Sequence, residues 1–292
     1  MELQWPLILF TTLVAWSAGL FGAQALMAFG GHGKRAQMPA WICSAALLVA
    51  GGVAVFFHLQ HWERIFNRFG HLTSGITQEL IAIVVLAAVA VAYLAAMRKS
   101  DDGASVPKWL AGVSIAVCVA LVAVMAHSYT MAARPAWDSV LWILYVLGNS
   151  CVLGPATMAV IMAVRGDDTA PAGLPALVGA AAAVVTTVAF AVFLQTAGAS
   201  FVEVGYYFDP THPTRAMADV GATVGSQAPL LWAGAVVVGA LAPLVACFLA
   251  KRKGDAAAWK LWGVVALAAV LVGAICLRVA FYNLGLSVFM FY

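Results

Sequence analysis

Long runs of apolar residues dominate the chain, and short polar segments separate them. Because about 20 helical residues cross a bilayer core of about 30 Å, the pattern predicts eight membrane-spanning helices. We expect these spans at residues 5–30, 38–59, 75–97, 107–127, 137–163, 172–195, 227–250 and 258–283. The segments between them, such as GGHGK and KRKGD, contain glycines and charges that end helices. The sequence therefore predicts an all-α integral membrane bundle that forms a single domain over residues 1–292.

The composition agrees with this pattern and excludes other classes of protein. Of the 292 residues, 64% are hydrophobic and only 9% are charged, whereas a soluble domain carries about 25% charged residues. A net charge of +3 gives little support to nucleic-acid binding. Glu2 precedes the first apolar run and no Lys or Arg does. A cleaved signal peptide needs a positive segment there, so we expect the first run to be retained as a span.

The cysteines give no sign of metal or disulfide chemistry. They lie far apart within apolar runs and form no CxxC pair. We therefore expect buried small hydrophobic residues, and no iron–sulfur cluster held by this chain's own cysteines. The five are Cys43, Cys118, Cys151, Cys247 and Cys276.

The distribution of basic residues predicts the orientation in the membrane. An even number of spans puts both termini on one side, where the loops carry Arg64, Arg68, Arg134 and Arg215. The loops on the other side carry Lys34, Arg35, Arg98, Lys99, Lys108, Arg165, Lys251, Arg252, Lys253 and Lys260. Because Lys and Arg accumulate on the cytoplasmic side, we expect both termini to be extracytoplasmic. The connection 56–80 and the long polar segment 196–226 then face outward, and the latter is either a docking surface or a solvated loop.

Four polar residues of the spans fall at one depth. Glu79 lies about one turn inside the third span, and Arg278 lies near the outer end of the eighth. His58 and His127 lie at the outer ends of the second and fourth spans. Ionisable groups within spans are costly and point to function. A shared level just inside the outer interface therefore predicts a site there.

Quinol oxidation fits residues of these types at this depth, because the quinol head group lies in the interfacial part of a bilayer. A histidine can hydrogen-bond a quinol hydroxyl and accept its proton near neutral pH. A carboxylate can relay that proton to water, and an arginine can hold the carboxylate ionised or polarise a ring oxygen.

Other interpretations remain open at this point. His58 can be a polar tip at the interface, His127 a helix cap, and Arg278 a side chain that extends to the interface. Glu79 and Arg278 can form a structural ion pair. Haem binding by His58 and His127 is a further alternative, although a two-haem arrangement needs four histidines at two depths. A secondary transporter would favour ionisable groups near the midplane, and a purely structural tether would need no intramembrane Glu79.

The chain resembles the membrane-anchor subunits of the dimethyl sulfoxide reductase family (DmsC-like). Residues 58–67 fit the run H-L-x-x-x-x-R-x-F-N, which includes His58 and Arg64. Glu79 in TQELIAI matches a Glu near the start of the third span, and residues 278–282 match R-x-x-F-Y. One departure follows His58-Leu59, where Gln60, His61 and Trp62 replace the usual glycine and small residue.

The resemblance implies an anchor that oxidises menaquinol and contains neither haem nor metal. In the family, the residues that match His58 and Glu79 are linked to menaquinol binding. We expect the quinol site to include His58, Arg64, Glu79, His127, Arg278 and Tyr282.

The resemblance also implies two partners in the cytoplasmic (inner) membrane complex. A subunit with four iron–sulfur clusters would receive the electrons, and we expect it to dock on the extracytoplasmic face. A catalytic subunit with a molybdopterin cofactor would then pass them to dimethyl sulfoxide, amine N-oxides or similar acceptors in anaerobic respiration. The related NrfD-like anchors also handle quinones and are the alternative family.

Overall fold

The computed structural model describes residues 4–58, 74–198 and 220–286. These residues form helices and connections, with no strand among them. The helices are α1 (Trp5–Phe29), η1 (Lys34–Ala36), α2 (Gln37–Phe56), α3 (Gly75–Lys99), α4 (Lys108–His127), α5 (Val140–Arg165), α6 (Ala170–Gln195), α8 (Val220–Ser226), η3 (Leu230–Leu241), α9 (Ala242–Lys253), α10 (Ala256–Ala258), η4 (Trp259–Gly263) and α11 (Val264–Asn283).

Eight helices in the described part of the chain are long and apolar enough to cross a membrane, which confirms the predicted bundle. The seventh crossing extends over 34 residues, Val220–Lys253, and begins earlier than the expected residue 227. It includes the π-helical stretch η3, which apolar periodicity does not reveal. The fifth begins at Val140 and not at residue 137, because Ser139 caps it through a 3.2 Å hydrogen bond from Leu141 N to its hydroxyl.

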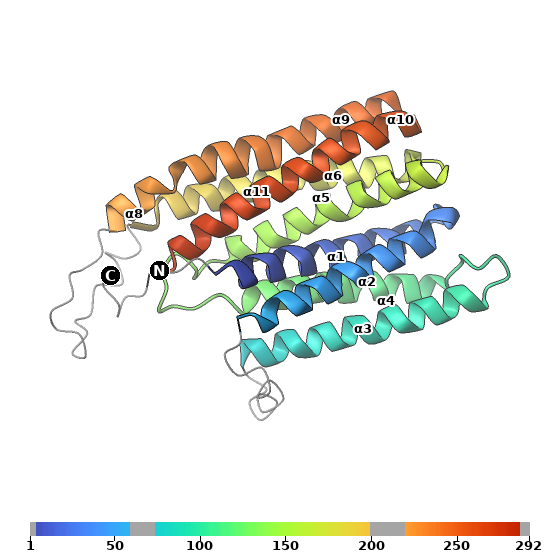
Figure 1. Cartoon of the computed structure of the whole chain (residues 1–292), viewed down its shortest axis with the longest axis horizontal. Helices are drawn as coiled ribbons and strands as arrows, with labels where there is room; N and C mark the ends of the chain where they lie inside the picture. Colours follow the sequence, from blue (N-terminus) through green and yellow to red (C-terminus); the bar gives the residue numbers. More distant parts are fainter. Residues whose placement is uncertain (1–3, 59–73, 199–219, 287–292) are drawn as a thin grey trace.

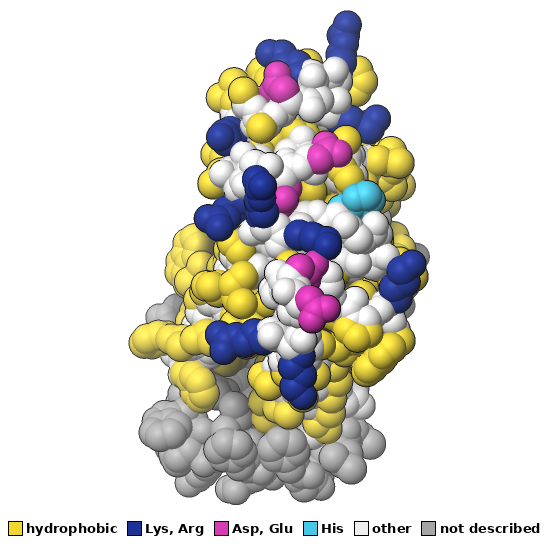
Figure 2. All heavy atoms as spheres, turned by 90° about the vertical axis from the view of Figure 1, so that its right-hand side faces the viewer, with side chains coloured by type: hydrophobic (Ala, Val, Ile, Leu, Met, Phe, Trp, Pro, Cys, Tyr) yellow, Lys and Arg dark blue, Asp and Glu magenta, His cyan; other side chains and the backbone are white. Residues whose placement is uncertain are grey.

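Successive spans run in opposite directions, so their connections gather at the two ends of the bundle (Figure 1). We call one end the Arg278 end: α1, α3 and α5 begin there, and α2, α4, α6 and α11 finish there. The opposite end, with the α1–α2, α3–α4, α5–α6 and α9–α10 connections, is the lysine-rich end. Figure 2 shows that face, with many Lys and Arg side chains and several carboxylates among them.

Small residues allow the spans to approach closely at the centre of the bundle. A Cβ atom added to Gly154 of α5 would overlap the backbone carbonyl of Gly19 in α1. Gly239 and Gly273 meet in the same way between η3 and α11. Helices in lipid gain little from hydrophobic burial, so close van der Waals packing of this kind holds them together.

The cysteines are all free, but they are not all buried. Cys118 and Cys247 are buried and Cys43 and Cys276 partly so, whereas Cys151 is exposed. The prediction of burial was therefore wrong for Cys151, which lines an apolar groove of about 350 Å³ that residues of α1, α4, α5 and α6 form. An apolar side chain suits lipid as well as a protein core, so hydrophobicity alone did not distinguish the two.

Candidate functional site

The Arg278 end contains a buried polar site. Arg278 lies in the last turns of α11, and Glu79 lies about one turn into α3. Both side chains are buried, with exposed fractions of 0% and 8%. Ionised side chains are costly to bury in a bilayer unless polar groups surround them, so the partners of each one define what this end of the bundle is built to do.

Neutral groups hold the Arg278 guanidinium. Its Nε donates to the Thr11 hydroxyl at 3.0 Å, and Nη1 donates to the Tyr145 hydroxyl and to the Ala274 carbonyl, both at 3.3 Å. Its carbon also lies 5.8 Å from the centre of the Trp142 ring, within cation–π range. Among the described residues no carboxylate forms an ion pair with Arg278. A full positive charge is therefore held inside the bundle without a counter-charge in contact.

A cluster of aromatic rings surrounds the arginine. The Trp142 ring stacks on Phe281 with a centroid distance of 4.0 Å, and Trp137 stacks on the same ring at 4.8 Å. Trp137 also donates from its indole nitrogen to the Phe281 carbonyl at 2.7 Å, which ties the α4–α5 connection to α11. Stacked rings of this kind form a rigid apolar wall beside Arg278.

Close packing of two helices positions Glu79. Gly75, the first residue of α3, lies against Ser128, and a Cβ added there would approach the Ser128 Cβ to 3.0 Å. This contact brings the first turn of α3 beside the last turn of α4, and Glu79 forms a side-chain hydrogen bond with Ser128. Its Oε1 atom is buried and has no hydrogen-bond partner among the described residues. One oxygen of the carboxyl group is therefore left for another partner.

Two tyrosines interact with both the carboxylate and the arginine. Tyr129 and Tyr282 pack edge to face at 6.2 Å, and each interacts electrostatically with both Glu79 and Arg278. Burial, with added contributions from Tyr282 and Glu79, raises the pKa of Tyr129 well above its usual value, so its hydroxyl keeps its proton. The Tyr282 hydroxyl is buried and makes no hydrogen bond of normal geometry in the described structure, although it lies close enough to the Tyr129 hydroxyl to interact with it. Tyr129 and Tyr282 thus belong to the same polar environment as Glu79 and Arg278.

The structure brings together only some of the expected site residues. Glu79, Arg278 and Tyr282 share one environment, whereas His58 and His127 are exposed. His127 ends α4 and its Nδ1 lies 3.1 Å from the Thr130 hydroxyl, as expected of a cap. Both histidines do lie at the Arg278 end, as the sequence predicted. Their exposure means that neither is part of the buried cluster.

The alternatives for the buried pair are also resolved. Glu79 and Arg278 form no ion pair within 4.0 Å, and Arg278 is held within the bundle instead of extending to the interface. The remaining expected site residue, Arg64, lies outside the described residues. So do residues 59–67 of the run that carried the family resemblance.

Several residues that build this site were not predicted from the sequence. Tyr129 lies just after the fourth span, where aromatic residues commonly mark the membrane interface, but it is 9% exposed and contacts Tyr282. Trp142 and Tyr145 of α5 also contact Arg278. Together with Asn149 they form a buried row at spacings of three and four residues. Polar and aromatic residues at that spacing on one face of an apolar helix were the available signal.

The fold and the site define an integral membrane protein with a buried polar centre near one membrane interface. The model of the family described as DMSO reductase anchor subunit (DmsC) matches residues 1–284, so the chain belongs to that family. A search among curated proteins gives no match. The protein is therefore a membrane anchor of a DMSO reductase-type complex, associated with a catalytic and an iron–sulfur subunit.

Proposed function

We propose that this anchor oxidises menaquinol at the Arg278 end and passes the electrons to the iron–sulfur subunit. One observation carries the proposal. Glu79 Oε1 and the Tyr282 hydroxyl are both buried without a hydrogen bond of normal geometry in the described structure, and both groups interact electrostatically with Tyr129. Buried polar atoms nearly always have partners, so two such atoms in one environment favour a bound molecule with hydroxyl groups.

Glu79 is the proton acceptor in this proposal. Oxidation of a quinol to the quinone releases two electrons and two protons. The electrons pass to the iron–sulfur subunit, and Glu79 Oε1 accepts a proton from the substrate hydroxyl, one proton at a time. Both protons leave for water at the Arg278 end, and the quinone leaves into the bilayer.

Ser128 gives this carboxylate a partner in both protonation states. The Ser128 hydroxyl donates to the Met125 carbonyl at 2.7 Å, and a hydroxyl has only one proton to donate. Protonated Glu79 can therefore donate to the Ser128 oxygen while that bond is kept. Ionised Glu79 instead requires the Ser128 hydroxyl to turn toward it. A carboxyl group that takes up and releases protons needs a hydrogen-bond partner in both states, and the turn of the Ser128 hydroxyl provides one.

Arg278 would stabilise the negative charge that develops on the substrate oxygen when its proton leaves. Its guanidinium contacts only neutral groups and no carboxylate in the described structure, so its charge is not already balanced. A fixed charge in a water-poor site is most effective when it is held in place before the reaction. The stacked rings of Trp142 and Phe281 provide the apolar wall for the substrate ring.

The exposed histidines of this end have a different proposed role. His58 and His127 would line the entrance to the quinol site, with His58 as a proton acceptor between Glu79 and water. Arg64, which lies outside the described residues, is proposed as a further residue of the quinol site. Because an iron–sulfur cluster must come close to the quinol, we propose that the partner docks on the Arg278 end. Protease digestion of oriented vesicles should then reach the partner from the extracytoplasmic side. Access from the cytoplasmic side alone would contradict this orientation.

The site is tested by removing the proton acceptor without changing its shape. In the purified complex, Glu79→Gln should lower the rate of menaquinol-analogue oxidation by about 10²-fold or more, the usual contribution of general base catalysis. The matched control is Asp102→Asn, which makes the same chemical change in the α3–α4 loop at the lysine-rich end. Normal oxidation by Glu79→Gln, with the subunits still assembled, would show that the carboxylate is not the acceptor.

A further inference from the structure

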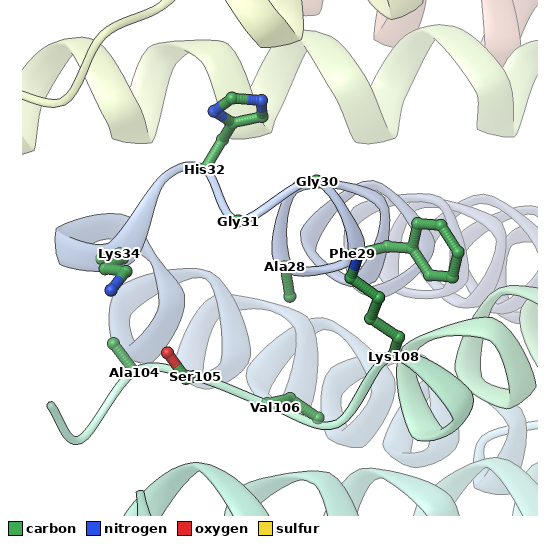
Figure 3. Close-up of a pocket in the computed structure, with 10 residues that line it drawn as sticks. All are labelled: Ala28, Phe29, Gly30, Gly31, His32, Lys34, Ala104, Ser105, Val106 and Lys108. Atoms are coloured by element: carbon green, nitrogen blue, oxygen red, sulfur yellow. The ribbon is translucent and has the colours of Figure 1, made fainter. Parts of the chain in front are cut away.

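A pocket at the lysine-rich end lies far from the quinol site, and none of its lining residues is among the expected site residues. It has a volume of about 260 Å³ and lies between the turn after α1 and the segment before α4. Figure 3 shows Lys34 at one end of this pocket and Lys108 at the other, with the segment Ala104–Ser105–Val106 along one side. The ten lining residues include these two lysines and His32, and no Asp or Glu.

The carboxylate of Asp102 fixes the shape of the pocket, because it holds the lining segment Ala104–Ser105 in place. Asp102 accepts hydrogen bonds from Ser105 N at 2.9 Å, from the Ser105 hydroxyl at 2.7 Å and from Ala104 N at 3.1 Å. Lys34 then connects this loop to the turn after α1 through a 2.7 Å ion pair with Asp102. The two walls are thus joined before any ligand arrives.

The second lysine provides the charge that is not neutralised. Lys108 begins α4, and its ammonium lies 5.9 Å from the centre of the Phe29 ring. No carboxylate of the described structure forms an ion pair with it. The neighbouring N-terminal turn of α4 adds its partial positive charge on the same side. An anionic group would therefore be attracted to the Lys108 side of the pocket.

The depth and the rim of the pocket identify the kind of anion. The end of α1 and the start of α4 mark a membrane interface, where phospholipid phosphates lie. Two large apolar side chains near Lys108 are exposed: the lining residue Phe29 is 46% exposed, and Trp109, the next residue in the chain, is 70% exposed. A soluble anion would use only the lysines, whereas a phospholipid has a phosphate for the lysines and acyl chains for Phe29 and Trp109.

We propose that this pocket binds the phosphate group of an anionic phospholipid. Lys108 contacts the phosphate directly, Lys34 contributes from the opposite end, and Phe29 packs against the start of an acyl chain. Basic pockets between membrane helices hold anionic head groups in this way. The bound lipid fills the space between α1 and the α3–α4 connection and stabilises their contact. This inference does not depend on quinol oxidation.

The test measures lipid retention by the full chain in its complex. The complex is transferred to nanodiscs that contain equal amounts of phosphatidylglycerol and phosphatidylcholine, then delipidated stepwise and analysed by native mass spectrometry. The wild type should retain phosphatidylglycerol in preference to phosphatidylcholine. Lys108→Gln should reduce this retention about five-fold, the factor for about 1 kcal/mol per lysine near anionic lipid. The matched control is Lys260→Gln in η4 at the same end, which should change retention little.

Three results would overturn the proposal. Equal retention of the two lipids would show no preference for the anion. Equal losses in Lys108→Gln and Lys260→Gln would show a general effect of surface charge and no site. Displacement of the lipid by millimolar inorganic phosphate would show a site for a soluble anion and not for a phospholipid. Lys34→Gln is a second variant, and its retention should also fall while oxidation of the menaquinol analogue stays normal.

Discussion

The Tyr282 hydroxyl offers a prediction in which stability and activity change in different directions. It makes no hydrogen bond of normal geometry in the described structure, although the side chain is only 3% exposed. Tyr282→Phe therefore removes no well-formed hydrogen bond from the fold. Because an unsatisfied buried polar group costs about 1–3 kcal/mol, the free energy of unfolding should stay the same or rise. If the hydroxyl binds substrate, the variant loses one neutral hydrogen bond, so oxidation should slow by roughly five- to ten-fold.

Tyr93→Phe is the matched control for this change. The Tyr93 hydroxyl donates to Gln37 Oε1 at 2.9 Å, and its side chain is fully buried. Gln37 Oε1 still accepts from Gln24 Nε2 at 3.1 Å after the substitution, so the loss should be about 1 kcal/mol. That corresponds to a fall in Tm of roughly 2–4 °C. Menaquinol-analogue oxidation should remain at the wild-type rate.

The assay combines thermal unfolding of each complex in nanodiscs with steady-state oxidation of a menaquinol analogue. The expected pattern is an active but less stable Tyr93→Phe and a stable but slow Tyr282→Phe. Full activity in Tyr282→Phe would refute the role of this hydroxyl in substrate binding. A larger fall in Tm for Tyr282→Phe than for Tyr93→Phe would refute the argument that the fold leaves it unpaired.

Further predictions concern both ends of the bundle. Gly75→Ala should push α3 away from Ser128 by a few tenths of an ångström and slow oxidation, whereas Gly52→Ala, with no heavy atom within 4 Å of the added Cβ, should not. Ser139→Ala should lower the unfolding free energy by about 1 kcal/mol in chemical denaturation, because it removes the α5 cap. The ion pair with Lys34 lowers the pKa of Asp102 most, and the hydrogen bonds from Ser105 and Ala104 lower it further. The contacts of Asp102 with these groups are therefore fully formed above the ordinary Asp pKa. They are lost only as the pH falls through the lowered pKa. Hydrogen exchange at the Ser105 amide, corrected for the intrinsic rate, should therefore be constant from about pH 7 to pH 5. Loss of protection within this pH range would contradict the ion pair between Lys34 and Asp102. The purified chain should show no Soret band, and a band that disappears in a His58→Ala variant would instead establish haem.

The spans were predictable because each depends on a local property. About 20 consecutive apolar residues are enough to identify a crossing, whatever the neighbouring helices do. The errors occurred at the ends of spans, where hydrophobicity does not fix the first helical residue. The seventh crossing begins at Val220 in a segment of small and polar residues, and the fifth begins only after the Ser139 cap. The side of the membrane on which each end lies remains a prediction from the basic residues.

The polar site was predictable in part for the same reason. Counting residues from the ends of spans placed Glu79 and Arg278 at one level, and the structure has them at one end of the bundle. The residue count did not show that His58 and His127 are exposed, nor that Tyr129 is buried and interacts with both charged groups. Those facts depend on how the helices are rotated and on the α4–α5 connection.

The sequence by itself determined the membrane location, the number of crossings and the depth of the charged groups. Only the tertiary structure decided which side chains face each other: Arg278 with Thr11 and Tyr145, and Glu79 with Ser128. The physical reason is that lipid and protein interior are both apolar, so a spanning helix carries little pattern to show which face is turned inward. Helix rotation is set instead by close contacts between small residues, such as Gly75 against Ser128, and these contacts join residues far apart in the chain.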